Sequence, residues 1–140
     1  MVKEKVMKRY DWYRVGQFLS VFMGGMIGGV GRYEVGIWLN DGHSLLATTT
    51  VNLVGCFLLV FTIYGLDLHF AFPEWIILGL GTGIIGAFTT FSTFTVQFVQ
   101  TIQTDSLTAI GFLAANLFGG MLMAILGFGA VQLIKWRVRE

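Results

Sequence analysis

The feature that most constrains this chain is a succession of long apolar runs that carry almost no charge. Hydrophobic residues make up 55% of its 140 residues, charged residues make up 12%, and the mean hydropathy is +0.74. A soluble domain has about a quarter of charged residues. A run of ~20 apolar residues is long enough to cross the ~30 Å hydrocarbon core of a bilayer as a helix. The sequence therefore predicts an integral, all-α membrane protein.

Four of the runs are long enough to be transmembrane helices. They cover residues 15–39, 45–66, 74–100 and 107–136. The ends of these spans carry the four tryptophans, whose amphipathic rings favour the membrane–water interface: Trp12, Trp38, Trp75 and Trp136. Because the connectors are short, we expect residues 1–140 to form a single four-helix transmembrane domain with no extramembrane domain.

Several other classes of protein are not indicated. The sequence has no metal-binding cluster, no catalytic triad and no phosphate-binding loop. The stretch GTGIIG at 81–86 fits a loose G-x-G-x-x-G pattern, but it lies inside a predicted membrane span rather than after a strand. The lone cysteine, Cys56, excludes an intrachain disulfide. We therefore expect neither an enzyme nor a nucleotide or nucleic-acid partner.

The third span contains the unusual stretch GTGIIGAFTTFSTF, residues 81–94. Its glycines, Gly81, Gly83 and Gly86, weaken helicity where the span is mid-membrane. A helix that breaks at these glycines directs freed carbonyl oxygens into the protein interior, where they can bind a cation. The sequence therefore predicts that the third helix is broken in the middle of the membrane.

Aromatic rings and hydroxyl groups follow directly after these glycines. Phe91 and Phe94 are three residues apart and share a helix face. The edge of a phenyl ring is positive, so two rings presented edge-on can stabilise a dehydrated anion. The side chains of Ser92, Thr93 and the intramembrane Asn52 can donate hydrogen bonds without carrying a charge. A fixed positive charge would trap an anion. Such residues suit a permeation path for a small anion.

Three further features of the spans have both a structural and a functional interpretation. Asn52 and Asn116 lie mid-span and Arg32 lies late in the first span. Polar groups at such depths are functional candidates, although interhelical hydrogen bonds would also explain the asparagines and snorkelling would explain the arginine. The glycine-rich stretches at 24–31 and 119–129 predict small-residue faces for helix packing.

At these residues the sequence resembles the Fluc/CrcB family of fluoride channels, over almost the whole chain. The matching stretches are GGMIGGVGRY at 24–33, TTTVNLVGCFLLVF at 48–61 and GIIGAFTTFSTF at 83–94. The resemblance implies a passive channel that exports fluoride across the cell membrane. It further implies an antiparallel, dual-topology dimer with two fluoride pores along the subunit interface and a central structural sodium ion.

The resemblance also assigns roles to individual positions. Gly86 and Thr89 match the residues whose backbone carbonyls hold the sodium ion. Arg32 matches the arginine of the first-span motif. The pore positions correspond to Asn52, Phe91, Ser92, Thr93 and Phe94. The fourth span departs from the family pattern: where a tyrosine and a serine commonly stand four residues apart, this chain has Phe112 and Asn116, the latter our candidate pore residue there.

Two other functions stay open at this stage. A small proton-coupled multidrug transporter also works as an antiparallel pair of four-span chains. It needs a titratable carboxylate deep in the first span, and Glu34 lies close to the end of that span. A non-conducting partner subunit of a fluoride channel is the other alternative, because the changes at Phe112 and Asn116 alter one end of a pore.

The distribution of basic residues predicts the orientation of the chain. Four spans place both termini on one side of the membrane, and that side then holds eight of the nine basic residues, the ninth being Arg32. The positive-inside rule favours cytoplasmic termini for such a chain. An antiparallel dimer needs one inverted subunit, so we hypothesise a heterodimer with a homologous partner of opposite orientation. A homodimer that tolerates the charge bias is the alternative.

Overall fold

The computed structural model of the chain describes residues 2–39, 45–69 and 72–138. All regular structure in these residues is helical, in four long helices of which the third is divided into segments. In chain order the elements are α1 (Val2–Trp38), α2 (Leu46–His69), α3 (Glu74–Leu78), the π-helix η1 (Gly79–Ile85), α4 (Gly86–Phe88), α5 (Ser92–Thr104) and α6 (Ser106–Val138). The predicted all-helical fold with a broken third helix is confirmed.

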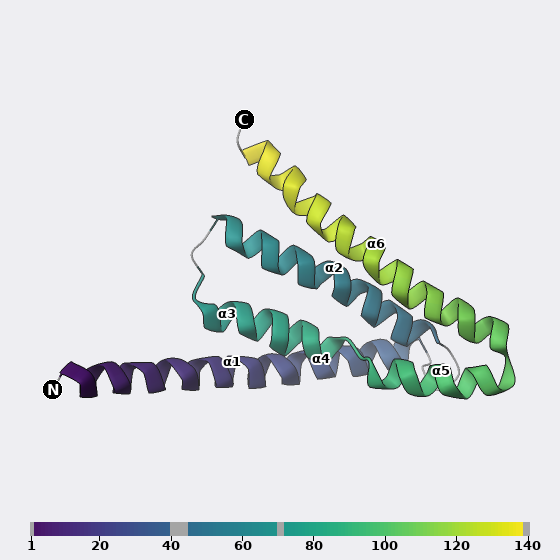
Figure 1. Cartoon of the computed structure of the whole chain (residues 1–140), viewed down its shortest axis with the longest axis horizontal. Helices are drawn as coiled ribbons and strands as arrows, with labels where there is room; N and C mark the ends of the chain where they lie inside the picture. Colours follow the sequence, from purple (N-terminus) through teal and green to yellow (C-terminus); the bar gives the residue numbers. More distant parts are fainter. Residues whose placement is uncertain (1, 40–44, 70–71, 139–140) are drawn as a thin grey trace.

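Successive long helices run in alternating directions, so the N-terminal end of α1 and the C-terminal end of α6 lie on the same side of the molecule (Figure 1). Helix α2 packs along α6, and α1 packs along α3, η1 and α4. After the break, α5 packs against α6. The third helix therefore contacts both halves of the bundle. Its first part, η1, lies against α1, and its last part, α5, lies against α6, which is paired with α2.

Three stretches of the described residues are long and apolar enough to cross a membrane: Leu46–Leu66, Glu74–Thr104 and Ser106–Arg137. Helix α1 is not one of these three stretches. Its uncharged part, residues 15–31, is rich in glycine, which is only weakly apolar, and is bounded by Arg14 and Arg32. This part nevertheless packs along η1 and α4. The 37 residues of α1 extend for about 55 Å, so the helix reaches well beyond a ~30 Å apolar layer.

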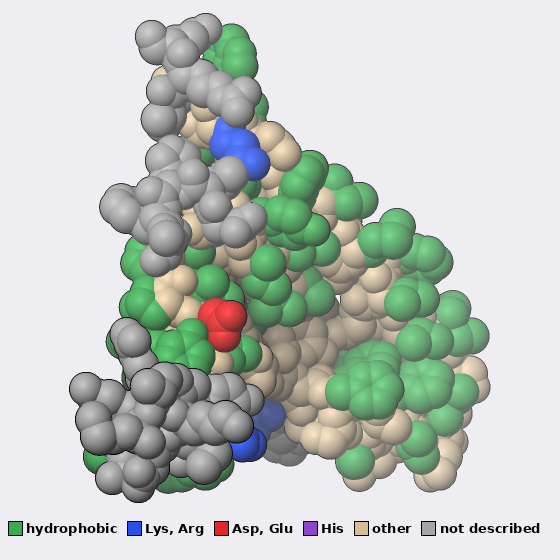
Figure 2. Space-filling model, turned by 60° about the vertical axis from the view of Figure 1, so that its left-hand side comes forward, with side chains coloured by type: hydrophobic (Ala, Val, Ile, Leu, Met, Phe, Trp, Pro, Cys, Tyr) green, Lys and Arg blue, Asp and Glu red, His purple; other side chains and the backbone are tan. Residues whose placement is uncertain are grey.

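The surface of the described residues is strongly apolar. Figure 2 shows a face covered mainly by hydrophobic and uncharged side chains. Large side chains such as Phe22, Ile27, Leu122 and Ile125 are more than half exposed. The hydrophobic core of the described chain is correspondingly small. An apolar surface of this extent requires lipid or another subunit to cover it.

The close contact between α1 and η1 depends on glycine. A Cβ atom built at Gly24 would lie 2.3 Å from the Gly79 carbonyl oxygen, and one at Gly28 would lie 2.0 Å from the Ile84 carbonyl oxygen. A Cβ at Gly83 would lie 2.9 Å from the Val21 carbonyl oxygen. We call Gly24, Gly28, Gly79 and Gly83 the glycine seam. The packing role predicted for the glycines of 24–31 is confirmed for Gly24 and Gly28, where the two backbones approach too closely for any side chain, whereas Gly25 and Gly29 have no atom of the chain within 4 Å of a Cβ position.

The break in the third helix lies three residues beyond the position predicted from the glycines. Gly81 and Gly83 are inside η1, and Gly86 has helical backbone angles of φ −63° and ψ −34°. The chain leaves the helix at Thr89, whose ψ is 161°, and α5 begins at Ser92. The predicted location was therefore wrong. Contact with α1 holds the glycine-rich segment in a helical path, which widens into a π-helix instead of ending.

The junction between α5 and α6 is formed by Asp105, at which the backbone is extended. Its carboxylate accepts hydrogen bonds from the Leu107 N–H (3.0 Å), the Thr108 N–H (3.2 Å) and the Thr108 hydroxyl. The hydroxyl and the N–H of Thr108 lower the pKa of the Asp105 carboxyl. This carboxylate thus caps α6, and the chain reverses within a single residue.

Candidate functional site

The broken segment Thr89–Phe91 exposes backbone groups that a continuous helix would have paired. The last helical bond before the break runs from the Thr89 N–H to the Ile85 carbonyl (3.0 Å), and regular pairing resumes where the Thr95 N–H donates to the Phe91 carbonyl (2.9 Å). Inside a membrane such unpaired groups need partners from elsewhere in the protein. The side chains around the break show how this is achieved.

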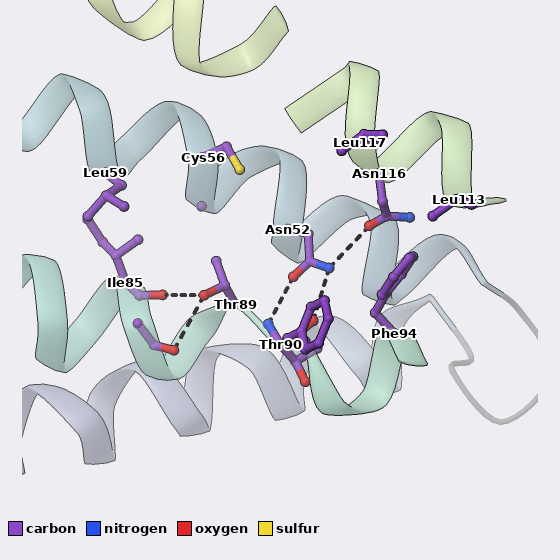
Figure 3. Close-up of a pocket in the computed structure, with 13 residues that line it drawn as sticks. Asn52, Cys56, Leu59, Ile85, Thr89, Thr90, Phe94, Leu113, Asn116 and Leu117 are labelled. Carbon is purple, nitrogen blue, oxygen red and sulfur yellow. Dashed lines mark hydrogen bonds between the residues drawn. The ribbon is translucent and has the colours of Figure 1, made fainter. Parts of the chain in front are cut away.

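Asn52 of α2 supplies the partner of Thr90. The Thr90 N–H donates to Asn52 Oδ1 (2.9 Å), and Asn52 Nδ2 donates to the Thr90 carbonyl oxygen (3.1 Å) (Figure 3). The side-chain amide thereby pairs with both polar groups of one backbone residue, as a neighbouring strand would. Thr90 is 7% exposed, so these bonds satisfy groups that are withdrawn from solvent. We call this pair of bonds the Asn52 bracket.

Asn116 of α6 supports the bracket from behind. Asn52 Nδ2 also donates to Asn116 Oδ1 (3.1 Å), and Asn116 Nδ2 donates to Thr49 Oγ1 (3.2 Å) and to the Phe112 carbonyl oxygen (2.9 Å). Each amide nitrogen carries two hydrogens. All four amide hydrogens of Asn52 and Asn116 are therefore engaged within the chain.

The hydroxyl groups after the break form a second cluster. The Thr90 hydroxyl donates to Thr93 Oγ1 (3.0 Å) and accepts from the Thr93 N–H (3.2 Å), and the Ser92 hydroxyl lies 3.5 Å from it. Ser92 is exposed and Thr93 is half-buried. Because the Ser92 contact is long and the Thr93 hydroxyl is an acceptor from Thr90, these two groups keep donor capacity that the asparagines lack.

The aromatic residues form a continuous row beside these hydroxyls. The ring centroids of Phe91 and Phe94 lie 6.0 Å apart, and those of Phe94 and Phe112 lie 5.0 Å apart at an interplanar angle of 39°. Phe94 also lies 6.4 Å from Phe98. Phe112 is 5% exposed, whereas Phe91 is 80% exposed. The row thus runs from a buried ring on α6 to one that the isolated chain leaves uncovered.

The two asparagines, the broken segment Thr89–Phe91 and Phe94 line one pocket of about 410 Å³, bounded by α2, α6 and the two sides of the break. Figure 3 shows Asn52, Asn116, Thr89, Thr90 and Phe94 around it. The remaining wall is mostly aliphatic, and none of the lining residues is acidic. The structure therefore places Asn52, Asn116, Phe91, Phe94, Gly86 and Thr89 together, although they come from three different spans.

Ser92, Thr93 and Arg32 lie outside this lining. Thr93 and Arg32 instead share a small gap on the α1 side of the break, together with Thr90. Arg32 is exposed in the isolated chain. The break is therefore flanked by two chemically different regions, an aromatic pocket toward α6 and a hydroxyl-lined, basic region toward α1.

Three residues of the site were not singled out from the sequence. Thr90 provides the backbone that Asn52 brackets, and Thr49 accepts from Asn116. Gly55 makes room for Thr89, because a Cβ at residue 55 would lie 2.0 Å from Thr89 Cγ2. The spacing of Gly55 could have identified it, because Gly55 follows Asn52 by three residues and therefore lies on the same face of α2. No comparable signal identified Thr90 or Thr49 among the many threonines of the chain.

The oxygen atoms at the break suit a hard cation. The Thr89 hydroxyl donates to the Ile85 carbonyl (3.1 Å) and, at 3.4 Å, to the Gly86 carbonyl. Among the described residues, the Gly86 and Thr89 carbonyl oxygens accept no backbone hydrogen bond. Uncharged carbonyl oxygens of this kind are the ligands that channel proteins offer to alkali-metal ions. One chain supplies only a partial set.

These features define a class: small helical membrane proteins whose third helix is interrupted and bracketed beside a row of phenylalanines. The sequence model of the family described as CrcB-like protein, Camphor Resistance (CrcB) matches residues 19–128. The chain belongs to this family.

Curated relatives agree with this assignment. The chain is 42% identical over 111 residues to the fluoride-specific ion channel FluC 2 of Listeria monocytogenes serotype 4b (strain F2365), covering 79% of this chain and 86% of that protein. It is 40% identical over 114 residues to FluC 2 of Ligilactobacillus salivarius, covering 81% and 84%. It is 34% identical over 119 residues to FluC of Bordetella petrii, covering 84% and 93%.

Proposed function

We propose that this chain is a subunit of a fluoride-specific ion channel in the cell membrane, through which fluoride leaves the cytoplasm passively. The observation that carries the proposal is the bracketed break, which sets Phe91 and Phe94 in one uncharged pocket with Asn52 and Asn116. The proposal is supported by the names of the relatives, all of which are fluoride-specific channels. A channel of this kind is not an enzyme.

The chemistry of the site suits a small, strongly hydrated anion. A fluoride ion loses its hydration shell when it leaves water, and the site must replace that shell without holding the ion too tightly. The positive edges of Phe91 and Phe94 provide weak electrostatic contacts, and the Ser92 and Thr93 hydroxyls provide donors. A contact between fluoride and the Asn52 or Asn116 amide requires one of their present hydrogen bonds to open.

The phenylalanine pair gives the test. Phe91→Ile and Phe94→Ile remove the positive ring edge while keeping an apolar side chain, so each should reduce fluoride efflux from liposomes by at least tenfold. Because Phe91 is 80% exposed in the chain, its replacement should leave the helical fold of the subunit, followed by circular dichroism, unchanged. Wild-type efflux rates in both variants would remove the rings from the mechanism.

The carbonyl oxygens of Gly86 and Thr89 would hold a structural sodium ion, completed by the same residues of a second subunit. When bound, the ion supplies a positive charge that ties the two breaks together. Thr89→Val keeps the backbone carbonyl and should preserve sodium-dependent stabilisation of the dimer. Melting curves in sodium and in choline chloride test this assignment: identical melting temperatures in the two salts would contradict it.

The antiparallel dimer remains part of the proposal, with termini of this chain in the cytoplasm. An exposed Phe91 and an incomplete carbonyl set both point to a second subunit. The concentration of basic residues at the termini favours a homologous partner of opposite orientation. Expression of the chain alone with a terminal tag decides between heterodimer and homodimer. A tag found on both membrane faces, with fluoride efflux from the purified chain, would exclude the heterodimer.

The multidrug-transporter alternative has less support from the site. Glu34 is exposed near the C-terminal end of α1, and no acidic side chain lines the pocket of about 410 Å³. The non-conducting subunit is distinguished by the efflux assay itself, carried out with the chain alone and with a partner.

A further inference from the structure

A second and much smaller cavity lies on the α1 side of the break. Its volume is about 20 Å³. Helix α1 contributes Arg32 to its wall, α2 contributes Thr48 and Val51, the broken segment contributes Thr90, and α5 contributes Thr93. A cavity of this size admits one water molecule when at least two polar groups surround it.

The Thr48 hydroxyl is a buried polar group at this gap that needs a hydrogen-bond partner. Thr48 is 2% exposed, and its Oγ1 atom makes no hydrogen bond with any group of the described chain. The neighbouring hydroxyl of Thr49, in contrast, donates to the Leu45 carbonyl in the ordinary way (2.9 Å). Buried hydroxyl groups in folded proteins have partners, which are ordered water where the protein provides none. The gap is the space that such a partner can fill.

The opposite wall has matching hydrogen-bonding capacity. A hydroxyl offers one donor and two acceptor sites. The Thr90 hydroxyl donates to Thr93 and accepts from the Thr93 N–H, and the Ser92 hydroxyl lies 3.5 Å from it as a donor to its second acceptor site. The Thr93 hydroxyl accepts from Thr90, and within the described residues nothing receives its hydrogen. A water in the gap can therefore accept from Thr93 and bond Thr48.

We propose that a single buried water occupies this gap and links Thr48 of α2 to the Thr90–Thr93 hydroxyl pair. Thr48 and Asn52 are four residues apart on one face of α2. The two residues hold the break together, Asn52 by direct bonds to the Thr90 backbone and Thr48 through the water. Arg32 of α1, an exposed residue, also belongs to the wall of the gap.

The sign of one substitution tests the proposal. Valine has nearly the shape of threonine but no hydroxyl. If the gap holds a water, Thr48→Val removes one of its hydrogen bonds, and the folded-to-unfolded ratio in detergent should fall about fivefold. If the gap is empty, the same change removes an unsatisfied buried group and should raise the ratio. A ratio equal to or above that of the wild type therefore overturns the proposal.

Crystallography of the dimer, grown without fluoride, gives an independent readout. A spherical density peak bonded to the residue-48 hydroxyl is expected in the wild type and in Thr48→Ser, which keeps the donor, but not in Thr48→Val. An empty gap in the wild type would overturn the proposal. A peak that appears only after crystals are soaked in fluoride would also overturn it, since the occupant would then be an anion.

Discussion

The third helix is held by two kinds of contact, and they differ on the two sides of its break. Before the break, η1 lies against α1 through the glycine seam, where backbone meets backbone with no side chain between. At the break, Thr90 is held by the side-chain amide of Asn52 from α2, which in turn donates to Asn116 of α6. The first contact fixes where the helix runs, and the second fixes where it can stop.

The difference explains why the break falls at threonines rather than at glycines. A glycine in a membrane helix is commonly a packing residue, because close approach of two backbones stabilises the pair. An interruption needs partners for its freed backbone groups, and Asn52 provides them only at Thr90. The position of the break is therefore set by the partner on α2 and not by local helix propensity.

The largest effect is expected from the glycine seam. Gly28→Ala would place a Cβ 2.0 Å from the Ile84 carbonyl oxygen, so α1 and η1 must separate. We expect a loss of about 3 kcal/mol of stability, at the upper end of overpacking effects. Denaturant titration in detergent, followed by circular dichroism, measures it. Gly29→Ala is the matched control because no atom of the chain lies within 4 Å of its Cβ position. Equal stability of the two variants would contradict the seam.

A smaller effect is expected from the bracket. Asn52→Leu leaves the Thr90 N–H and carbonyl without partners, at a cost of about 2 kcal/mol. Stability and fluoride efflux should fall together, because the broken segment loses its position. Phe91→Ile provides the contrast, with reduced efflux and an unchanged helical fold of the subunit. If Asn52→Leu lowers efflux but not stability, the asparagine acts on the ion and the bracket is not structural.

The smallest effect is expected behind the bracket. Asn116→Leu removes the contacts to Asn52 and Thr49, but Asn52 keeps both bonds to Thr90, so the cost should be about 1 kcal/mol. A double-mutant cycle with Asn52→Leu sharpens this expectation. Because Asn116 acts partly through Asn52, the double variant should lose less stability than the sum of the single variants. Strict additivity would show that the two asparagines support the helix independently.

Much of the site could be identified from the sequence, because polar residues are conspicuous in apolar spans. Asn52 and Asn116 were selected on that basis, and Phe91 and Phe94 by their shared helix face beside the hydroxyl residues; the structure brings all four to one pocket. Thr90 and Thr49 could not be selected, since their roles depend on which hydroxyl or backbone group faces an asparagine from another helix. The expectation that the helix breaks at the glycines, Gly86 included, was wrong, because the Gly86 backbone is helical and the chain leaves the helix at Thr89.

The sequence by itself determined the membrane location, the helical fold, the presence of a break and the chemistry available beside it. These follow from composition and from the cost of placing polar groups in hydrocarbon, which local sequence reports directly. Only the tertiary structure shows that glycines pack α1 against η1 while the helix is interrupted at threonines. It also shows that Asn52 and Asn116 donate all their amide hydrogens to groups of the same chain. Those outcomes depend on contacts between α1 and η1 and between α2, α6 and the break. Residues more than thirty positions apart make these contacts, and no local pattern encodes them.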